Sequence, residues 1–136
     1  MALNTLFVTT AVIEAGAGLA LLCLPSAVAK LLLGTPLEAP AAFTVARVGG
    51  AGLFTLGIAC WLARGDAKSP AARGLITAMV VYNFCVALIL GIAGIGSGRV
   101  GVALWPAVVL HTAMTAWCIM SVRHLSHAQE PENLHQ

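Results

Sequence analysis

The stretch GLITAMVVYNFCVALILGIAGI, residues 74–95, contains no charged side chain and decides the fold class. As an α-helix rising about 1.5 Å per residue, it spans roughly 30 Å, the thickness of the hydrocarbon core of a bilayer. Three further apolar runs reach a similar length, at residues 4–24, 41–63 and 102–122. Because lipid offers the backbone no hydrogen-bond partners, each run is predicted to cross the membrane as a helix.

The composition of the chain agrees with lipid as its solvent. Hydrophobic residues make up 60% of the 136 residues and charged residues only 9%, too few to give a soluble domain its charged shell. The net charge of +2 is too small to indicate a nucleic-acid partner. Because the joints between the runs are short, neighbouring helices are expected to be antiparallel. The predicted fold is an all-α integral membrane protein, a compact four-helix up-down antiparallel bundle. We expect one domain over residues 1–123 and a polar, flexible tail over residues 124–136.

One alternative for residues 4–24 is a cleaved signal peptide, since AVA at residues 27–29 resembles a signal-peptidase site. Residues 1–4 carry no basic side chain, and Glu14 interrupts the apolar region. Both features are untypical of a signal peptide, so we expect this segment to be a permanent span.

Basic residues in the short joints predict the orientation, because cytoplasmic joints are enriched in Lys and Arg. One side carries Arg64, Lys68, Arg73 and Arg123, and the other carries Lys30 and Arg99. This distribution predicts that both termini lie in the cytoplasm. In the joint at residues 26–40, Val28 and Leu31–Leu33 are expected to form a half-buried turn of helix in the membrane interface.

Small residues recur four positions apart within the predicted spans. The pairs are Gly16/Ala20, Ala46/Gly50, Ala87/Gly91 and Gly94/Gly98. In lipid, where no hydrophobic effect drives helices together, such pairs let two backbones approach closely. They are therefore predicted to lie at helix–helix contacts.

Every predicted span carries one strong polar group toward the middle of the membrane. These candidate ligand-binding residues are Glu14, Arg47, Asn83 and His111. Counted from the ends of their spans at about 1.5 Å per residue, Glu14 and Arg47 differ in depth by about 6 Å. A lone charge at the bilayer centre costs roughly 2.5–3.5 kcal/mol or more. We therefore expect the two side chains to pair, or Glu14 to be protonated.

Two interpretations of these polar residues stay open. In the first, Glu14 and Arg47 form a structural clasp, and Asn83 and His111 hold helices together through hydrogen bonds. In the second, the same residues line a pocket for a ligand head group or form a proton-handling site. The sequence does not separate the two.

No metal site, cofactor or enzyme class is indicated. The cysteines contain no CxxC pair and are interpreted as small apolar fillers of packed helices; they are Cys23, Cys60, Cys85 and Cys118. His111 has no second ligand at metal-binding spacing within the spans. The sequence contains no phosphate loop, nucleophile elbow or HExxH motif. The sequence therefore predicts no metal site. It identifies no cofactor and does not decide whether the protein is an enzyme.

Two short segments carry a family resemblance. IEAGAGLALL, residues 13–22, places an acidic residue in a glycine-rich first span, and ARVGGAGLFTLG, residues 46–57, places an arginine before glycines in the second. With four short spans, these features resemble the bacterial DoxX-like small membrane proteins. The wider group includes a quinone-linked sulfur-oxidising subunit, so the resemblance implies a quinone or lipid site between the helices. The acidic and basic positions of that pattern correspond to Glu14 and Arg47.

The resulting hypothesis is a small bacterial inner-membrane protein whose buried polar site holds a small amphipathic ligand, such as a quinone or a lipid. One alternative is a structural or accessory subunit, associated with a partner membrane subunit, that binds no ligand and whose polar residues only hold helices together. Another is a homo-oligomeric transporter or channel for a small solute. A third is a membrane enzyme that uses His111 and Glu14 as an acid/base pair.

Overall fold

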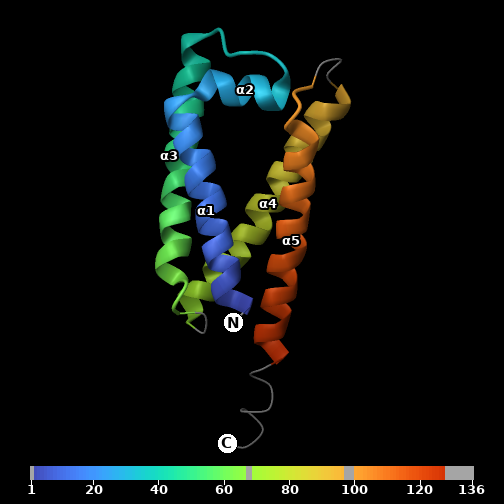
Figure 1. Cartoon of the computed structure of the whole chain (residues 1–136). Coiled ribbons are helices and arrows are strands. Elements are labelled where there is room, and N and C mark those ends of the chain that lie inside the picture. The colour runs from blue at the N-terminus through green and yellow to red at the C-terminus, as the bar shows by residue number, and fades with distance from the viewer. Residues whose placement is uncertain (1, 67–68, 97–99, 128–136) are drawn as a thin grey trace, which may run out of the picture.

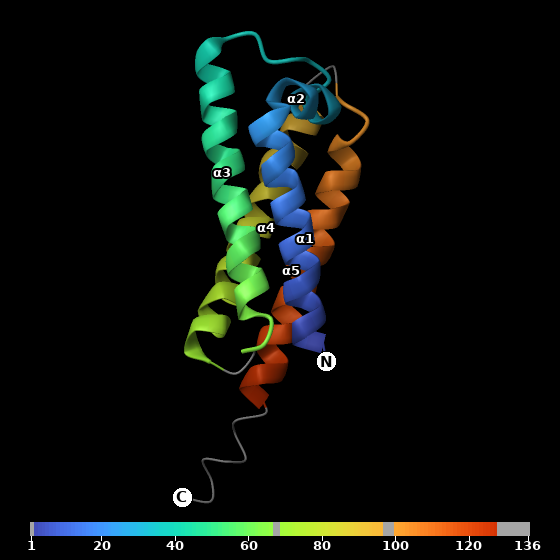
Figure 2. The same cartoon turned by 60° about the vertical axis from the view of Figure 1, so that its left-hand side comes forward.

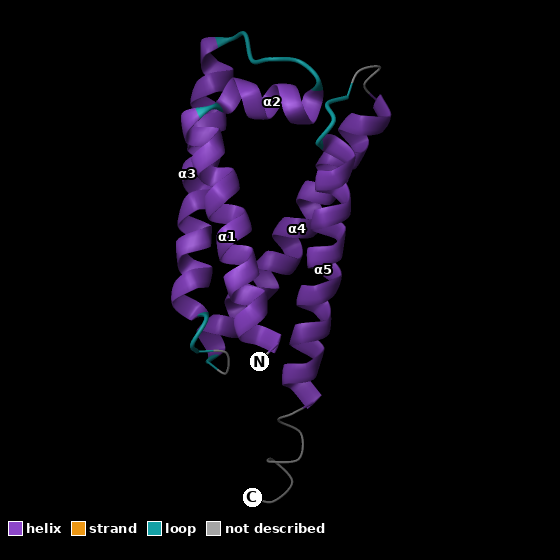
Figure 3. Ribbon diagram, in the orientation of Figure 1, coloured by secondary structure: helices purple, strands orange, loops and turns teal. Residues whose placement is uncertain are grey.

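The computed structural model describes residues 2–66, 69–96 and 100–127. Within these ranges the chain forms five helices and no strand (Figures 1 and 3). They are α1 (Ala2–Cys23), α2 (Pro25–Leu33), α3 (Pro40–Ala63), α4 (Pro70–Gly96) and α5 (Leu104–His127). The all-α prediction is confirmed. Lys68, Gly98, Arg99 and the predicted tail beyond residue 127 lie outside the described residues.

The four predicted spans overlap the four long helices, with differences only at the ends. α2, α3 and α4 each begin at a proline, where the missing N–H costs nothing because the first turn of a helix has no acceptor for it. The last helix continues to His127, so the backbone of residues 124–127 belongs to α5 rather than to a tail. All four long helices are apolar and long enough to cross a bilayer. The chain is therefore a multi-pass membrane protein with lipid around it.

The long helices run alternately up and down. α1 begins and α5 ends at one end of the molecule, and the joint between α3 and α4 lies at that same end (Figures 1 and 2). The four helices do not contact one another equally. α1 packs along α3 and α4 packs along α5, whereas contacts between these two pairs are few. The fold is an up-down antiparallel bundle assembled from two helix pairs.

The contact between α1 and α3 is a close approach of two backbones at glycine. A Cβ atom on Gly18 would lie 2.7 Å from the carbonyl oxygen of Gly50, and one on Gly50 would lie 2.8 Å from the carbonyl oxygen of Gly18. The sequence pairs identified only part of this contact. Gly50 lies in it as predicted, whereas Gly16 of α1 has no atom of a neighbouring element within 4 Å of a Cβ position. On α4, Gly94 packs against the start of α5 as predicted, whereas Gly91 has no such neighbour. Spacing alone did not reveal which face of each helix meets its neighbour.

The main cluster of packed hydrophobic side chains lies in the half of the bundle where α1 begins. Its buried residues come from all four long helices: Leu6, Phe7, Ala11, Cys60, Ala72, Ile76, Met79, Met114 and Cys118. Toward the opposite end the α1/α3 pair and the α4/α5 pair diverge (Figure 3). One half of the molecule is thus close-packed, whereas the two pairs separate in the other half, so the bundle is less compact than predicted.

The short helix α2 lies across the diverging end and connects the two pairs (Figure 1). At its start Ser26 Oγ accepts a hydrogen bond from Leu37 N at 3.1 Å. At its C-terminal end two carbonyl groups, which have no partner within the helix, accept hydrogen bonds from the residues directly before α5. Gly101 N donates to Leu32 O at 3.1 Å, and Ala103 N donates to Leu31 O at 2.9 Å. The predicted interfacial turn is therefore a helix of two to three turns, and its backbone is hydrogen-bonded to the residues directly before α5.

Candidate functional site

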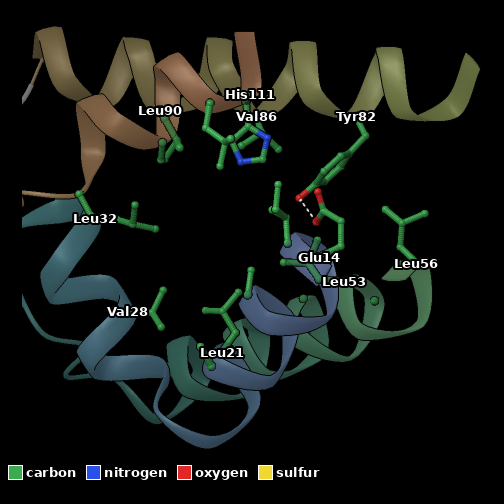
Figure 4. Close-up of a pocket in the computed structure, with 18 of the residues that line it drawn as sticks. Glu14, Leu21, Val28, Leu32, Leu53, Leu56, Tyr82, Val86, Leu90 and His111 are labelled. Carbon is green, nitrogen blue, oxygen red and sulfur yellow. Dashed lines mark hydrogen bonds between the residues drawn. The ribbon is translucent and has the colours of Figure 1, made fainter. Parts of the chain in front are cut away.

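A cavity of about 740 Å³ lies between the two helix pairs, in the half that the core does not fill. All five helices contribute to its wall, and α2 covers one end (Figure 4). Most of the lining is apolar, including Leu21, Val28, Leu32, Leu53, Leu56, Val86 and Leu90. Three side chains with polar groups interrupt it: Glu14, Tyr82 and His111. A volume of this size accommodates a drug-sized molecule, for which pockets of about 300–1,000 Å³ are usual.

Glu14 of α1 and Tyr82 of α4 meet across the gap between the two helix pairs. The Tyr82 hydroxyl donates a hydrogen bond to Glu14 Oε2 at 3.1 Å (Figure 4). Glu14 is only 2% exposed, although it lies about halfway along a membrane-spanning helix. Burying a carboxyl group in an apolar environment is costly unless it is hydrogen-bonded. The Tyr82 hydroxyl supplies one such bond and joins the two pairs at this depth.

His111 of α5 is held by Asn83 of α4. The two side chains form a hydrogen bond of 2.7 Å between His111 Nδ1 and Asn83 Oδ1. Asn83 is 1% exposed, and its Nδ2 donates to the Met79 carbonyl oxygen at 2.8 Å. The Tyr82 and His111 rings also contact each other edge to face, with centroids 5.9 Å apart and planes at 81°. The imidazole is therefore constrained by its neighbours on both sides.

Two polar atoms of this group have no hydrogen-bond partner among the described residues: Glu14 Oε1 and His111 Nε2. Neither atom is completely enclosed by other protein atoms. Among the described residues, the only fully buried side-chain nitrogen or oxygen without a partner is Arg73 Nε, in the first turn of α4. Since both residues line the cavity, these two atoms are accessible from it. A buried site with free hydrogen-bonding positions is suited to a guest with a polar group.

The predicted pairing of Glu14 with Arg47 is wrong. Arg47 is exposed and does not line the cavity, and the described residues contain no ion pair between it and Glu14. The reason is the direction in which Arg47 points from the axis of α3. At about 100° per residue, Arg47 lies on the opposite side of α3 from Leu56, which faces the cavity. Its position near the start of α3 lets its long stem carry the charge toward the membrane surface.

Three of the four sequence candidates come together in the structure: Glu14, Asn83 and His111. The residue missing from that prediction is Tyr82, which supplies the partner of Glu14. A signal for it exists in the sequence, because it is the single tyrosine of the chain and directly precedes Asn83 in an uncharged span. Neighbouring residues on a helix point about 100° apart, so Tyr82 faces Glu14 while Asn83 faces His111.

The cysteines lie apart from this site. Cys60 and Cys118 are buried in the core, Cys23 and Cys85 are exposed, and all are free thiols. Within the described ranges, no three His, Cys, Asp or Glu side chains are grouped as a metal ion requires. The polar side chains that line the cavity are Glu14, Tyr82 and His111.

Fold and site together define a small multi-pass helical membrane protein with an intramembrane cavity. Comparison with known proteins does not narrow this class further. No family model matches the chain, and neither a curated protein nor a solved structure matches it.

Proposed function

We propose that this protein binds a lipid-soluble small molecule in the cavity between its two helix pairs. The polar group of the ligand lies at Glu14, Tyr82 and His111, and its apolar part lies along the leucine and valine side chains toward α2. The ligand class is amphipathic: a quinone or a lipid-like molecule.

One observation carries this proposal. The cavity is apolar except where Glu14, Tyr82 and His111 face it, and two of their polar atoms have no partner among the described residues. Side chains that only joined helices would be expected to bond one another fully, because an unmade hydrogen bond in an apolar environment costs about 1–3 kcal/mol. Here the bonds that are formed join Glu14 to Tyr82 and His111 to Asn83, and the two atoms without a partner belong to residues that line the cavity.

The position of the cavity between membrane-spanning helices indicates where the ligand comes from. A cavity between membrane-spanning helices exchanges its contents with the bilayer more readily than with water, so the guest is a molecule dissolved in lipid. The DoxX-like resemblance of residues 13–22 and 46–57 supports a quinone among such molecules and a bacterial inner membrane as the location. Arg47, the second position of that resemblance, is not part of the proposed site.

The double variant His111→Leu/Asn83→Leu tests the site. Replacing both partners of a buried hydrogen bond by apolar groups of similar shape is nearly neutral for stability, whereas replacing one strands the other. We therefore expect the double variant to melt within a few degrees of the wild type and to lose the bound molecule. Mass spectrometry of solvent extracts measures the retained molecule per protein after purification in mild detergent.

Arg47→Gln is the matched control, since it changes a polar membrane residue that lies away from the cavity. It should retain the molecule at the wild-type ratio. If the wild-type protein carries no molecule above the level of bulk lipid, or if the double variant keeps it, the cavity is not a binding site. The alternative of a structural subunit, in which these residues only hold helices, then becomes the better account.

The orientation of the chain is a separate prediction. Arg64 and Arg73 flank the joint between α3 and α4, at the end where α1 begins, and Lys30 lies on α2 at the other end. The excess of basic residues at the first end supports placing it, with both termini, in the cytoplasm. In a background without the native cysteines, Asp66→Cys should react with an impermeant thiol reagent only from the cytoplasmic side, and Lys30→Cys only from outside. Reaction of both from the same side would rule out this topology.

A further inference from the structure

We infer that the ligand presents a hydroxyl group to His111, so that the site selects hydrogen-bond donors over ethers and carbonyl compounds of the same shape. This inference rests on the proposed function and specifies the chemical class of its ligand.

The first step concerns the orientation of the Asn83 amide. Its nitrogen lies 2.8 Å from the Met79 carbonyl oxygen, which can only accept a hydrogen bond. The NH₂ group must therefore point toward Met79, and the other atom of the amide, Oδ1, faces His111. Burial of Asn83 at 1% exposure removes water as an alternative partner.

The second step fixes the imidazole. An amide oxygen accepts and never donates, so His111 Nδ1 must carry the hydrogen in the 2.7 Å bond to Asn83. A neutral imidazole holds only one ring proton, so Nε2 is then an acceptor with a free lone pair. The edge-to-face contact with Tyr82 opposes a flip of the ring that would exchange the two nitrogens. Asn83 thus acts as a positioning residue that sets the hydrogen-bonding character of His111.

The third step compares the polar groups that a ligand could bring. An ether or carbonyl oxygen has no proton to donate and leaves His111 Nε2 unsatisfied in an apolar cavity. A hydroxyl group donates to Nε2. Glu14 does not discriminate in this way, because a carboxyl group accepts when ionised and also donates when protonated. Sites that bond a hydroxyl reject analogues without it far more strongly than apolar pockets reject a difference in size. Selectivity therefore comes from His111, and the ligands it favours are alcohols and phenols, including the reduced rather than the oxidised form of a quinone.

The probes 4-decylphenol and 4-decylanisole differ only in whether the ring oxygen carries hydrogen or a methyl group. Calorimetric titration into the full-length protein in detergent should show that the phenol binds at least about tenfold more tightly, the ratio expected for one unsatisfied buried hydrogen bond. Asn83→Leu releases the ring from its fixed tautomer, so Nε2 can also donate. In that variant the phenol/anisole ratio should fall below about threefold, mainly because the anisole binds better.

A spectroscopic measurement checks the tautomer independently of binding. Nitrogen NMR of histidine-labelled protein, with the His111 signals identified by their loss in His111→Gln, should show the proton on Nδ1 in the wild type and a mixture in Asn83→Leu. Equal binding of the two probes by the wild type, or an unchanged ratio in Asn83→Leu, would overturn the selectivity while leaving a binding cavity in place. If neither probe binds saturably, the proposed function fails together with this inference.

Discussion

Gly18→Ala is expected to lower the free energy of unfolding by about 3 kcal/mol, the upper part of the range for overpacked sites. A Cβ atom at this position would lie 2.7 Å from Gly50 O and 2.9 Å from Phe54 Cα, and it would also overlap Phe54 N. All three are main-chain atoms, which cannot rotate away as a side chain can. The new methyl group must therefore push α1 away from α3, the most extensive helix contact of the molecule.

Gly16→Ala is the matched control two residues earlier on the same helix. No atom of a neighbouring element lies within 4 Å of its Cβ position. The substitution should be neutral or stabilise the helix by up to about 1 kcal/mol, since alanine is the better helix former. Both variants can be unfolded by adding sodium dodecyl sulfate to protein in mild detergent, with circular dichroism as the readout. Equal effects of the two substitutions would contradict the close approach at Gly18 and favour the simpler small-residue pattern of the sequence.

Ala107→Trp is expected to reduce ligand binding by at least about 100-fold while the protein stays folded. Ala107 lines the cavity one helical turn from His111, on the same face of α5. An indole there occupies the volume that the apolar part of a ligand needs, and forcing both groups into it costs about 3 kcal/mol, equivalent to about 100-fold in affinity. Without ligand, the same side chain fills empty space, so the melting temperature should stay constant or rise.

Ala113→Trp on the same helix is the control, because Ala113 is exposed and lines no part of the cavity. It adds the same bulk and hydrophobicity to α5 but directs them toward lipid. Binding of 4-decylphenol should match that of the wild type. If Ala107→Trp binds the probe as well as the wild type does, the ligand lies elsewhere. If both variants lose binding, the effect belongs to α5 as a whole and not to the cavity.

The division of the bundle into a packed half and an open half links the fold to the proposed function. The core around Phe7, Ile76 and Met114 holds the four helices at one end. At the other end α2 spans the two pairs, and its Leu31 and Leu32 carbonyl groups accept hydrogen bonds from the residues directly before α5. Packing at one end and backbone hydrogen bonds at the other connect the two helix pairs on both sides of the cavity, which favours a volume that is already formed without a ligand. Such preorganisation reduces the entropy that binding would otherwise cost.

The sequence by itself determined that the protein lies in lipid, how many spans it has and that these spans are helices. These follow from length and charge alone: apolar runs of about 20 residues have no stable alternative to a helix in lipid, whatever their neighbours are. A polar side chain in the hydrocarbon core costs free energy, so polar residues at mid-membrane are rare unless they have a role. This made Glu14, Asn83 and His111 recognisable as candidates. Three of the four candidates do lie together.

Only the tertiary structure decided which of these residues meet. Depth along a helix can be counted from the sequence, but the direction in which a side chain points depends on how each helix is rotated against its neighbours. That rotation brought Tyr82 to Glu14 and turned Arg47 away, although Arg47 lies at a suitable depth. It also placed the backbone contact at Gly18 rather than at Gly16. The cavity has the same origin, because an empty volume between two helix pairs is a property of their divergence and leaves no pattern in the order of residues along the chain.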